Sequence, residues 1–493
     1  MAPPSVRPRL TFGMALCLAV MTTAAGRANE LDNLISLAFS NSPALHAVRE
    51  EVRQTIAARD AGGEFFDPRT TTAAGKLSGD AAATPLLDAP TGLPLADACG
   101  ISSAVEVPVR PGIYAGVGVS EQYLVNPAYG ITPGYRTLIG AQIRIPLLQD
   151  RGFSLWKRNL SRLKELQAAA DARLLETRQA VRHAVEQAYI DYLLGIANAA
   201  TLVSATDRAQ QLLKEAEELV RLKMVPEYQL APARLELAFR REEFCAAVQA
   251  IDTVRLRIVQ VLGVTSPPML TTNSNTLTDL IAGLRLPEAP TSGPSFAARG
   301  ALCEIEALVA AAAFETRSME DRLRPDLGIS LRGVWASEDS TVQTAGGEIF
   351  ANEPYSAAAV LVWQRPWSQT GAHARLREAR AREAQLAELQ RELQNRLTAD
   401  LAAARREFIG ASERLKEIAV AVEQARQTLD SEAERFRLGE GRSRNVLDAQ
   451  NDLTKTYQSR NAIVASLLKG HSNFMYATGY STVNIPAADA PHL

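Results

Sequence analysis

The chain has 493 residues, a formal net charge of −2 at pH 7 and only 6% aromatic residues. Because the charge is close to zero, the chain lacks the basic excess of a nucleic-acid-binding protein, and no nucleic-acid partner is expected. The low aromatic content argues against an all-β protein. The abundance of Ala, Leu, Arg, Glu and Gln in the middle and near the end is typical of long helices and coiled coils.

The N-terminal stretch 1–28 has the pattern of a secretory signal peptide. Arg7 and Arg9 form a short basic region, the apolar run at 11–21 is too short to span a bilayer, and small residues precede a cleavage site after Ala28. A buried N-terminal helix is the alternative. We therefore expect an exported chain that starts at residue 29 and carries no lipid anchor.

Three cysteines remain in the expected exported chain, at Cys99, Cys245 and Cys303. Their wide spacing does not form a disulfide framework, and no metal-ligand spacing accompanies them. We predict buried free thiols, with a single Cys245–Cys303 bridge as the alternative.

Residues 29–263 are predicted to form a first structural repeat. In its clearest strand, 137–147, apolar residues such as Ile143 alternate with polar residues such as Gln142, so one face is apolar and the other polar. A proline-free stretch with apolar residues at three- and four-residue spacings follows, and it predicts a helix about 105 Å long. The expected elements, in order, are a helix at 31–62, a strand region at 69–147, a long helix at 153–222 and a return helix at 227–262.

A linker at 264–294 leads into a second repeat at 295–480, and a tail follows at 481–493. When the sequence is shifted along itself so that Glu218–Val225 falls on Glu434–Gly441, the same shift places Gly263 on Gly479. A single shift that holds from position 218 to position 263 indicates an internal duplication. The expected elements of the second repeat are a strand region at 326–365, a long helix at 372–437 and a return helix at 443–477 with Ser443 as its N-cap.

The predicted strands match the spans of a transmembrane barrel, because they are about 11 residues long and apolar on one face. Trp335, Trp363 and Trp367 fit an interfacial aromatic girdle. Half-buried strands of a soluble protein are the alternative. Four strands per chain cannot close a barrel and lipid tolerates no open sheet edge, so the chain is expected to oligomerise, and a trimer would have twelve strands. A further strand pair at 101–124 is expected to be a hairpin outside the membrane. The alternative is that these two strands also cross the membrane, which gives two more crossings per chain.

Four short stretches carry a resemblance to a known family. They are Asn41–Leu45, Ile145–Gly152, Arg324–Leu327 and the stretch from Phe436 to Gln450. With these stretches, and over nearly all of residues 30–480 except an insertion near 80–125, the sequence resembles the TolC-like outer membrane efflux proteins. The resemblance implies a mainly α fold with β, in which a trimeric twelve-stranded outer-membrane barrel is continued by a long periplasmic α-helical barrel. It also implies a passive exit duct of a tripartite efflux or type I secretion system, docked to a periplasmic adaptor and an inner-membrane transporter.

The resemblance places the working tip of such a duct at the turns between the long and return helices. Gly439 and Gly441 permit a tight turn and the close approach of another backbone. Asp448 is expected to pair with a neighbouring arginine and hold the tunnel closed, with an ordinary acid in the first helical turns as the alternative. Arg442 and Arg444 are expected to contact the adaptor or to be solvated. The expected tip, gate and adaptor-contact residues are Arg437, Leu438, Gly439, Gly441, Arg442, Arg444, Asn445, Asp448, Arg221, Leu222 and Lys223.

No catalytic constellation is present in the sequence. The five histidines are far apart, and neither a Walker motif nor a glycine-rich phosphate-binding motif occurs. We therefore expect a non-enzyme without cofactor or metal, whose partners are copies of itself, outer-membrane lipid, an adaptor and a transporter. A periplasmic coiled-coil scaffold or adaptor with a small β-domain is the alternative, and the duplicated hairpins and strand pairs count against it.

Overall fold

A computed structural model describes most of the chain between residues 30 and 479. The signal peptide predicted at 1–28, the tail at 481–493 and most of the linker at 264–294 lie outside the described residues. By its internal contacts the chain divides into two units. Unit 1 contains Met1–Glu51, Ala170–Glu304 and Gln390–Leu493, and unit 2 contains Val52–Ala169 and Ile305–Leu389. The described residues are 30–78, 97–110, 112–126, 131–224, 226–268, 270, 276–283, 296, 298–341, 345, 355–438 and 440–479.

The long helices repeat one pattern. Helices α3 (Ser154–Arg221) and α8 (Thr370–Arg437) each have 68 residues, and the shift that places the start of α3 on the start of α8 also aligns their ends. Each is followed by a return helix, α4 (Leu230–Leu262) or α9 (Ser443–Thr478). Gly263 and Gly479 follow the return helices with φ values of 68° and 88°, a left-handed conformation that glycine adopts at little cost. Shorter helices α2 (Pro43–Ala61) and α6 (Gly300–Arg322) precede the strands of each half.

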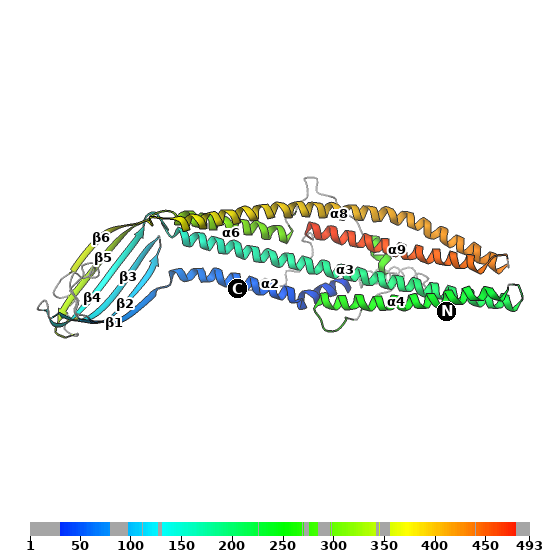
Figure 1. The fold of residues 1–493 in the computed structure, drawn as a ribbon, viewed down its shortest axis with the longest axis horizontal. Helices are drawn as coiled ribbons and strands as arrows, with labels where there is room; N and C mark the ends of the chain where they lie inside the picture. Colours follow the sequence, from blue (N-terminus) through cyan, green and yellow to red (C-terminus); the bar gives the residue numbers. More distant parts are fainter. Residues whose placement is uncertain are drawn as a thin grey trace, which may run out of the picture. The chain divides into compact units, whose positions relative to one another are not determined.

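Unit 2 contains a single antiparallel sheet of six strands in the order β1-β2-β3-β4-β5-β6 (Figure 1). Each strand pairs with its neighbours in the sequence, so the sheet is a meander. The strands are β1 (Arg69–Ser78), β2 (Asp97–Val109), β3 (Ile113–Asn126), β4 (Ile131–Pro146), β5 (Asp326–Asp339) and β6 (Tyr355–Gln364).

The described sheet has six strands: the four predicted as membrane strands are β1, β4, β5 and β6, and the further predicted pair is β2 and β3. The strand pair near 101–124 does not form a separate hairpin: β2 pairs with β1 from Asp97 to Glu106, and β3 pairs with β4 from Tyr114 to Asn126. Gly116 and Gly118 weaken the alternation of β3 in the sequence, and in the sheet they lie close to neighbouring strands, since a Cβ on Gly118 would lie 3.1 Å from the Cβ of Ala104. A twelve-stranded trimer therefore no longer follows from the strand count.

The register separates one apolar face of the sheet from one polar face. Residues opposite each other in antiparallel strands point to the same face. On the apolar face, rows of mostly aliphatic side chains cross the sheet, such as Val107, Ala115, Ile143, Leu331 and Ala359. The polar face carries rows such as Arg69, Glu106, Gly116, Gln142 and Arg332.

Unit 1 is held together by the apolar stripes of its helices. In its largest core cluster, Val185, Tyr192 and Leu193 of α3 pack with Leu262 of α4 and Val464 of α9, and all five are at most 3% exposed. Side chains three or four residues apart share one face of a helix, so each helix contributes a continuous stripe. The packing joins the two helical hairpins of the duplicated halves.

The prediction for the cysteines is partly wrong. None of the three forms a disulfide, as predicted, but Cys99 and Cys245 are exposed and Cys303 is half-buried. Cys99 lies on β2 and Cys245 on α4, each on an exposed face of its element. Whether a given face is exposed depends on how distant segments of the chain pack. No local pattern of residues indicates this exposure.

Replacing Gly479 by alanine tests the duplicated helix stop. A Cβ atom there would lie 2.6 Å from the carbonyl carbon of Ala298, in a backbone conformation that disfavours side chains. We expect Gly479→Ala to lower the free energy of unfolding by about 1–3 kcal/mol. Gly410→Ala is the matched control, because Gly410 lies inside α8 with open space at its Cβ position, and it should raise stability by about 0.5–1 kcal/mol. Denaturant unfolding followed by circular dichroism measures the stability of both variants. Equal effects of the two substitutions would contradict the assignment of Gly479 as a left-handed helix stop.

Candidate functional site

The turn between α3 and α4 forms the first tip of unit 1. Lys223 adopts a φ of 58°, which is unusual for a residue with a side chain. The backbone N–H groups of Lys223 and Met224 donate to the carbonyl groups of Val220 and Leu219, at 3.0 and 2.9 Å. This pair of bonds is a Schellman motif, in which the left-handed position is usually glycine. Leu222 is left 59% exposed at the turn.

The turn between α8 and α9 forms the second tip. Its Gly439 lies outside the described residues, but Glu440 and Gly441 both donate backbone hydrogen bonds to the carbonyl of Arg435, at 3.0 Å. A Cβ atom on Gly441 would lie only 2.9 Å from the backbone nitrogen of Phe436, so this position needs glycine. Leu438, which corresponds to Leu222 in the duplication, is 61% exposed.

The predicted N-cap of α9 is one residue too late. Arg442, with extended φ and ψ of −101° and 141°, takes the N-cap position, and its side chain makes no capping hydrogen bond. Ser443 is the first helical residue and is only 3% exposed. The reason is that Ser443 lies at the packed base of the turn, so its burial outweighs its preference for the cap.

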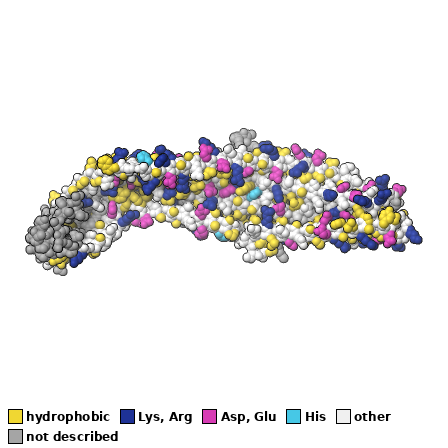
Figure 2. All heavy atoms as spheres, viewed as in Figure 1, with side chains coloured by type: hydrophobic (Ala, Val, Ile, Leu, Met, Phe, Trp, Pro, Cys, Tyr) yellow, Lys and Arg dark blue, Asp and Glu magenta, His cyan; other side chains and the backbone are white. Residues whose placement is uncertain are grey.

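The two tips lie together at the same end of unit 1 (Figure 1), around one apolar cluster. Phe436 is fully buried at its centre. Both hairpins contribute to the cluster, whose buried members are Leu212, Ala216, Leu219, Leu230, Leu429, Phe436, Val446, Leu447, Ala449 and Leu453. At this end Figure 2 shows hydrophobic side chains among Lys and Arg, and the exposed ones include Leu222, Met224, Tyr228 and Leu438. A buried core therefore fixes the position of exposed apolar side chains.

One ion pair connects the two hairpins next to this cluster. The guanidinium of Arg437, at the end of α8, lies 3.1 Å from the Glu215 carboxylate of α3. The hydrogen bond to Glu215 raises the pKa of Arg437 further above its usual range. The two side chains are 52% and 27% exposed, and such pairs contribute only about 0–1 kcal/mol to stability. The pair is therefore suited to opening and closing.

Arg437 was predicted from the sequence, but its partner Glu215 was not. Glu215 lies about two helical turns before Arg221, on a helix rich in other acids, and only the packing of the two hairpins selects it. Arg221 instead pairs within its own helix, with Glu218 at 2.7 Å. Arg442, Arg444, Asn445 and Asp448 are all exposed. In the described part of the chain, no ion pair forms at Asp448.

The apolar face of the sheet is the second candidate site, and aromatic residues mark both of its ends. At one end Trp335 pairs with Tyr355, and the rings of Tyr123 and Tyr135 lie 5.0 Å apart. At the other end Trp363 of β6 is 62% exposed and Trp367 fully so. The stretch from Tyr355 to Trp363 fills most of β6, and its length is within the roughly 9–11 residues that a strand needs to cross a bilayer.

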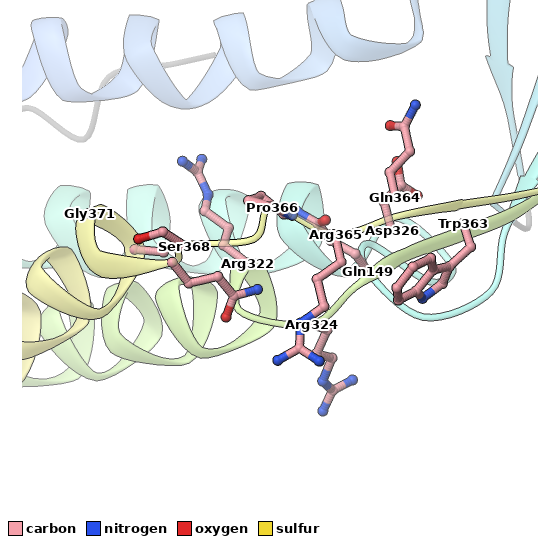
Figure 3. Close-up of a pocket in the computed structure, with 12 residues that line it drawn as sticks. Gln149, Arg322, Arg324, Asp326, Trp363, Gln364, Arg365, Pro366, Ser368 and Gly371 are labelled. Carbon is pink, nitrogen blue, oxygen red and sulfur yellow. The ribbon is translucent and has the colours of Figure 1, made fainter.

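Basic residues gather where the sheet meets the helices of unit 2. A hollow of about 780 Å³ there is lined by Arg322 and Arg324 at the end of α6, by Arg365 after β6 and by Trp363 (Figure 3). In Figure 3 the side chains of Arg324 and Arg365 extend to the same side of the ribbon as Trp363.

A buried acid anchors this junction. Asp321 is only 2% exposed, accepts a hydrogen bond from Ser154 Oγ at 2.6 Å and lies 3.3 Å from Arg324. Asp150 accepts a 2.8 Å bond from the backbone N–H of Leu155 in the first turn of α3, and burial raises the pKa of its carboxyl. These contacts fix the start of α3 and the end of α6 beside the sheet.

No group of three or more His, Cys, Asp or Glu side chains that could hold a metal ion occurs within the described residues.

Comparisons with known proteins define the class of fold. No protein-family model matches the chain, and no curated protein matches it. Several solved structures match. CusC, in a study of its transmembrane channel formation, has a TM-score of 0.67 and 16% identity over 92% of both chains. The outer-membrane channel OprN has a TM-score of 0.65 and 18% identity over 92% of this chain and 90% of that one, and the outer membrane protein VceC of Vibrio cholerae has a TM-score of 0.65 and 13% identity over 92% of this chain and 97% of that one.

The chain therefore has the fold of these outer-membrane channel proteins. This confirms, for the single chain, the fold that the resemblance to the TolC-like family implied. At identities of 13–18% the likeness establishes the fold.

Changing Lys223 to glycine tests the geometry of the first tip. Because Lys223 occupies a left-handed position, Lys223→Gly should raise the free energy of unfolding by about 1 kcal/mol. The matched control is Lys214→Gly, the same change at an exposed position inside α3, which should lower stability by about 1 kcal/mol. Denaturant midpoints of the detergent-purified variants give both values, and a loss of stability in Lys223→Gly would refute the assigned turn.

Proposed function

We propose that the protein is the passive outer-membrane exit duct of a tripartite efflux or type I secretion system. Its sheet lies in the outer membrane of a Gram-negative-type envelope, and its helices form a large periplasmic part. The observation that carries this proposal is the apolar face of the sheet with aromatic residues at both ends, in a chain that has the fold of outer-membrane channels. The predicted signal peptide at 1–28 supports export from the cytoplasm.

The exposed apolar side chains of the sheet support contact with lipid. Val117 is 60% exposed, Leu361 65% and Trp363 62%, whereas side chains of this kind in a water-soluble sheet are covered by another layer. Arg324 and Arg365 at the end of the sheet, and the exposed Trp367 shortly after β6, are the residue types that anchor a span at the membrane surface, because their polar ends reach the lipid headgroups.

The open edges of the sheet support assembly from several copies. In the described chain the outer edges of β1 and β6 have no strand partner. Unpaired backbone groups are excluded from the bilayer core, so β1 of one copy is proposed to pair with β6 of the next in a homotrimer.

The two tips are proposed to dock a periplasmic adaptor, through which an inner-membrane transporter delivers its cargo and supplies the energy. Leu222 and Leu438 occupy equivalent exposed positions on the duplicated hairpins, so one kind of adaptor surface fits both. Lys223, Arg442, Arg444 and Asn445, in or next to the same turns, are proposed as the polar contacts. Arg221 and Gly441 are proposed to shape the turns.

The Arg437–Glu215 pair is proposed as the contact that keeps the periplasmic end closed. It joins α8 to α3 beside the buried cluster around Phe436, so breaking it removes a contact between the hairpins without removing any side chain of that cluster. Asp448, exposed on α9, is proposed to add a contact to an arginine of a neighbouring copy. The protein is proposed to act without catalysis, since no reacting centre occurs among its described residues.

Single-channel conductance in planar bilayers tests the duct and its gate together. We expect detergent-purified wild type to insert and show a small, mostly closed conductance, and Arg437→Ala combined with Glu215→Ala to raise it several-fold. The control is Arg435→Ala combined with Glu432→Ala, which removes a 3.3 Å pair within α8 alone and should leave conductance unchanged.

The outcomes separate the parts of the proposal. Channels that conduct equally in wild type and both double variants would keep the duct but reject this gate. Folded protein that never inserts would reject the duct and favour the periplasmic scaffold or adaptor.

A further inference from the structure

We propose that the β2–β3 hairpin is part of the membrane-spanning wall, so that three copies of the chain close a barrel of 18 strands with a wide outlet. This inference rests on the proposed outer-membrane duct and adds its width, which the proposed function leaves open. It assigns the additional strands of the first half to the pore itself rather than to a surface loop.

The hairpin is an insertion when the two halves of the chain are compared. One shift of the sequence places the start of α3, Ser154, on the start of α8, Thr370. The same shift places Arg110 on the start of β5, Asp326. The sheet region of the first half, however, already starts at Arg69 with β1. The second half has two strands between its helices and the first half has four. Because β1 and β4 are the strands next to the helices, as β5 and β6 are, the additional strands are β2 and β3.

The insertion is integrated into the sheet by backbone pairing. β2 pairs with β1 from Asp97 to Glu106 and with β3 along its whole length. β1 and β4 do not meet, because the two inserted strands separate them. If the hairpin left the bilayer, it would expose the backbone groups of β1 and β4 to hydrocarbon, where no water can bond them.

The inserted strands share the two faces of the other four. Val105 of β2 and Val117 of β3 lie in the same row as Ala141, and all three are on the apolar face. Val105 and Val117 are 38% and 60% exposed, comparable with Leu331 of β5 at 40%. A hairpin in water outside the membrane has no reason to keep an apolar face in register with a lipid-facing one.

The charged side chains Lys76, Glu121 and Asp339 interrupt this apolar face, and their position fits the membrane surface: Lys76 and Asp339 lie in the row of Tyr123 and Tyr135, and Glu121 lies in the next row. Glu121 lies close to Tyr123, at the aromatic end of the sheet. Its carboxylate accepts a 2.5 Å hydrogen bond from Thr137 Oγ1 of β4. The carboxylate is thus at the level of the headgroups and bonded to the neighbouring strand, not at the middle of the apolar band.

The polar face of the inserted strands leaves the lumen open. Its central positions are small, and Gly100, Ala104, Gly116 and Gly118 all point to that face. A hollow of about 450 Å³ lies there, lined among others by Arg69, Glu106, Gln142 and Arg332. Barrel diameter grows roughly linearly with strand number, so 18 strands give about 1.5 times the diameter of twelve, in the range of porins with aqueous channels. An outlet of this width with a polar lining suits bulky hydrophilic cargo such as secreted polypeptide.

Lipid quenching of single fluorophores tests the position of the hairpin. In a background with Cys99→Ser, Cys245→Ser and Cys303→Ala, a bimane label is placed at Val117→Cys on the hairpin. The matched label is at Leu331→Cys on the apolar face of β5, and the control label is at Gln142→Cys on the polar face. The purified proteins are reconstituted in phosphatidylcholine vesicles with or without 12-doxyl phosphatidylcholine, and aqueous iodide is the second quencher.

We expect the doxyl lipid to quench the labels at positions 117 and 331 to the same extent, within about twofold, and iodide to quench the label at position 142. Quenching by lipid at position 331 but only by iodide at position 117 would overturn the inserted hairpin while keeping the duct. Lipid quenching at neither position would overturn both, because the sheet would then lie outside the bilayer.

The strand number is measured independently by electron cryomicroscopy of the unlabelled wild type in lipid nanodiscs. A wall of 18 strands around a threefold axis is the expected result. A wall of twelve strands with β2 and β3 outside it would overturn the inference even if the labelled variants failed to fold.

Discussion

Backbone hydrogen bonding between neighbouring strands is the constraint on which the proposed protein depends. In hydrocarbon no water replaces a missing partner, so each strand in the membrane must be paired on both sides. The described chain satisfies this for β2 to β5 and leaves β1 and β6 with open outer edges. This constraint has three consequences. Further copies of the chain are needed, they join through β1 and β6, and an inserted hairpin must pair on both of its sides.

The helical part works under a different constraint, because water can reach its surfaces. Here burial of apolar stripes fixes the helices, and the tips are held by the cluster around Phe436. Strong packing next to a weak, half-exposed ion pair is a suitable arrangement for a gate. The cluster keeps the hairpins folded, while the Arg437–Glu215 contact is weak enough for a partner to replace.

Much of the fold could be predicted because its signals are local. The predicted bounds of the long helices agree closely with those of α3 and α8, since glycine and proline mark where a helix stops, and the duplication is visible at a fixed offset. At the tips, the need for glycine at 441 follows from the pattern of the turn. The strand pair at 101–124 is recognisable in the sequence, but its place in the sheet is not. Its glycines hide the alternation, and pairing with β1 and β4 is a contact between distant edges.

The sequence by itself determined which stretches are helix and which are strand, where the helices end and that the chain has two similar halves. These properties depend on side-chain periodicity and on backbone preferences within a few residues. Only the tertiary structure decided that six strands form one sheet, that Glu215 is the partner of Arg437 at the tip, and that Cys99 and Cys245 are exposed. Each of these depends on which surfaces meet across long stretches of chain, and no local pattern specifies that meeting.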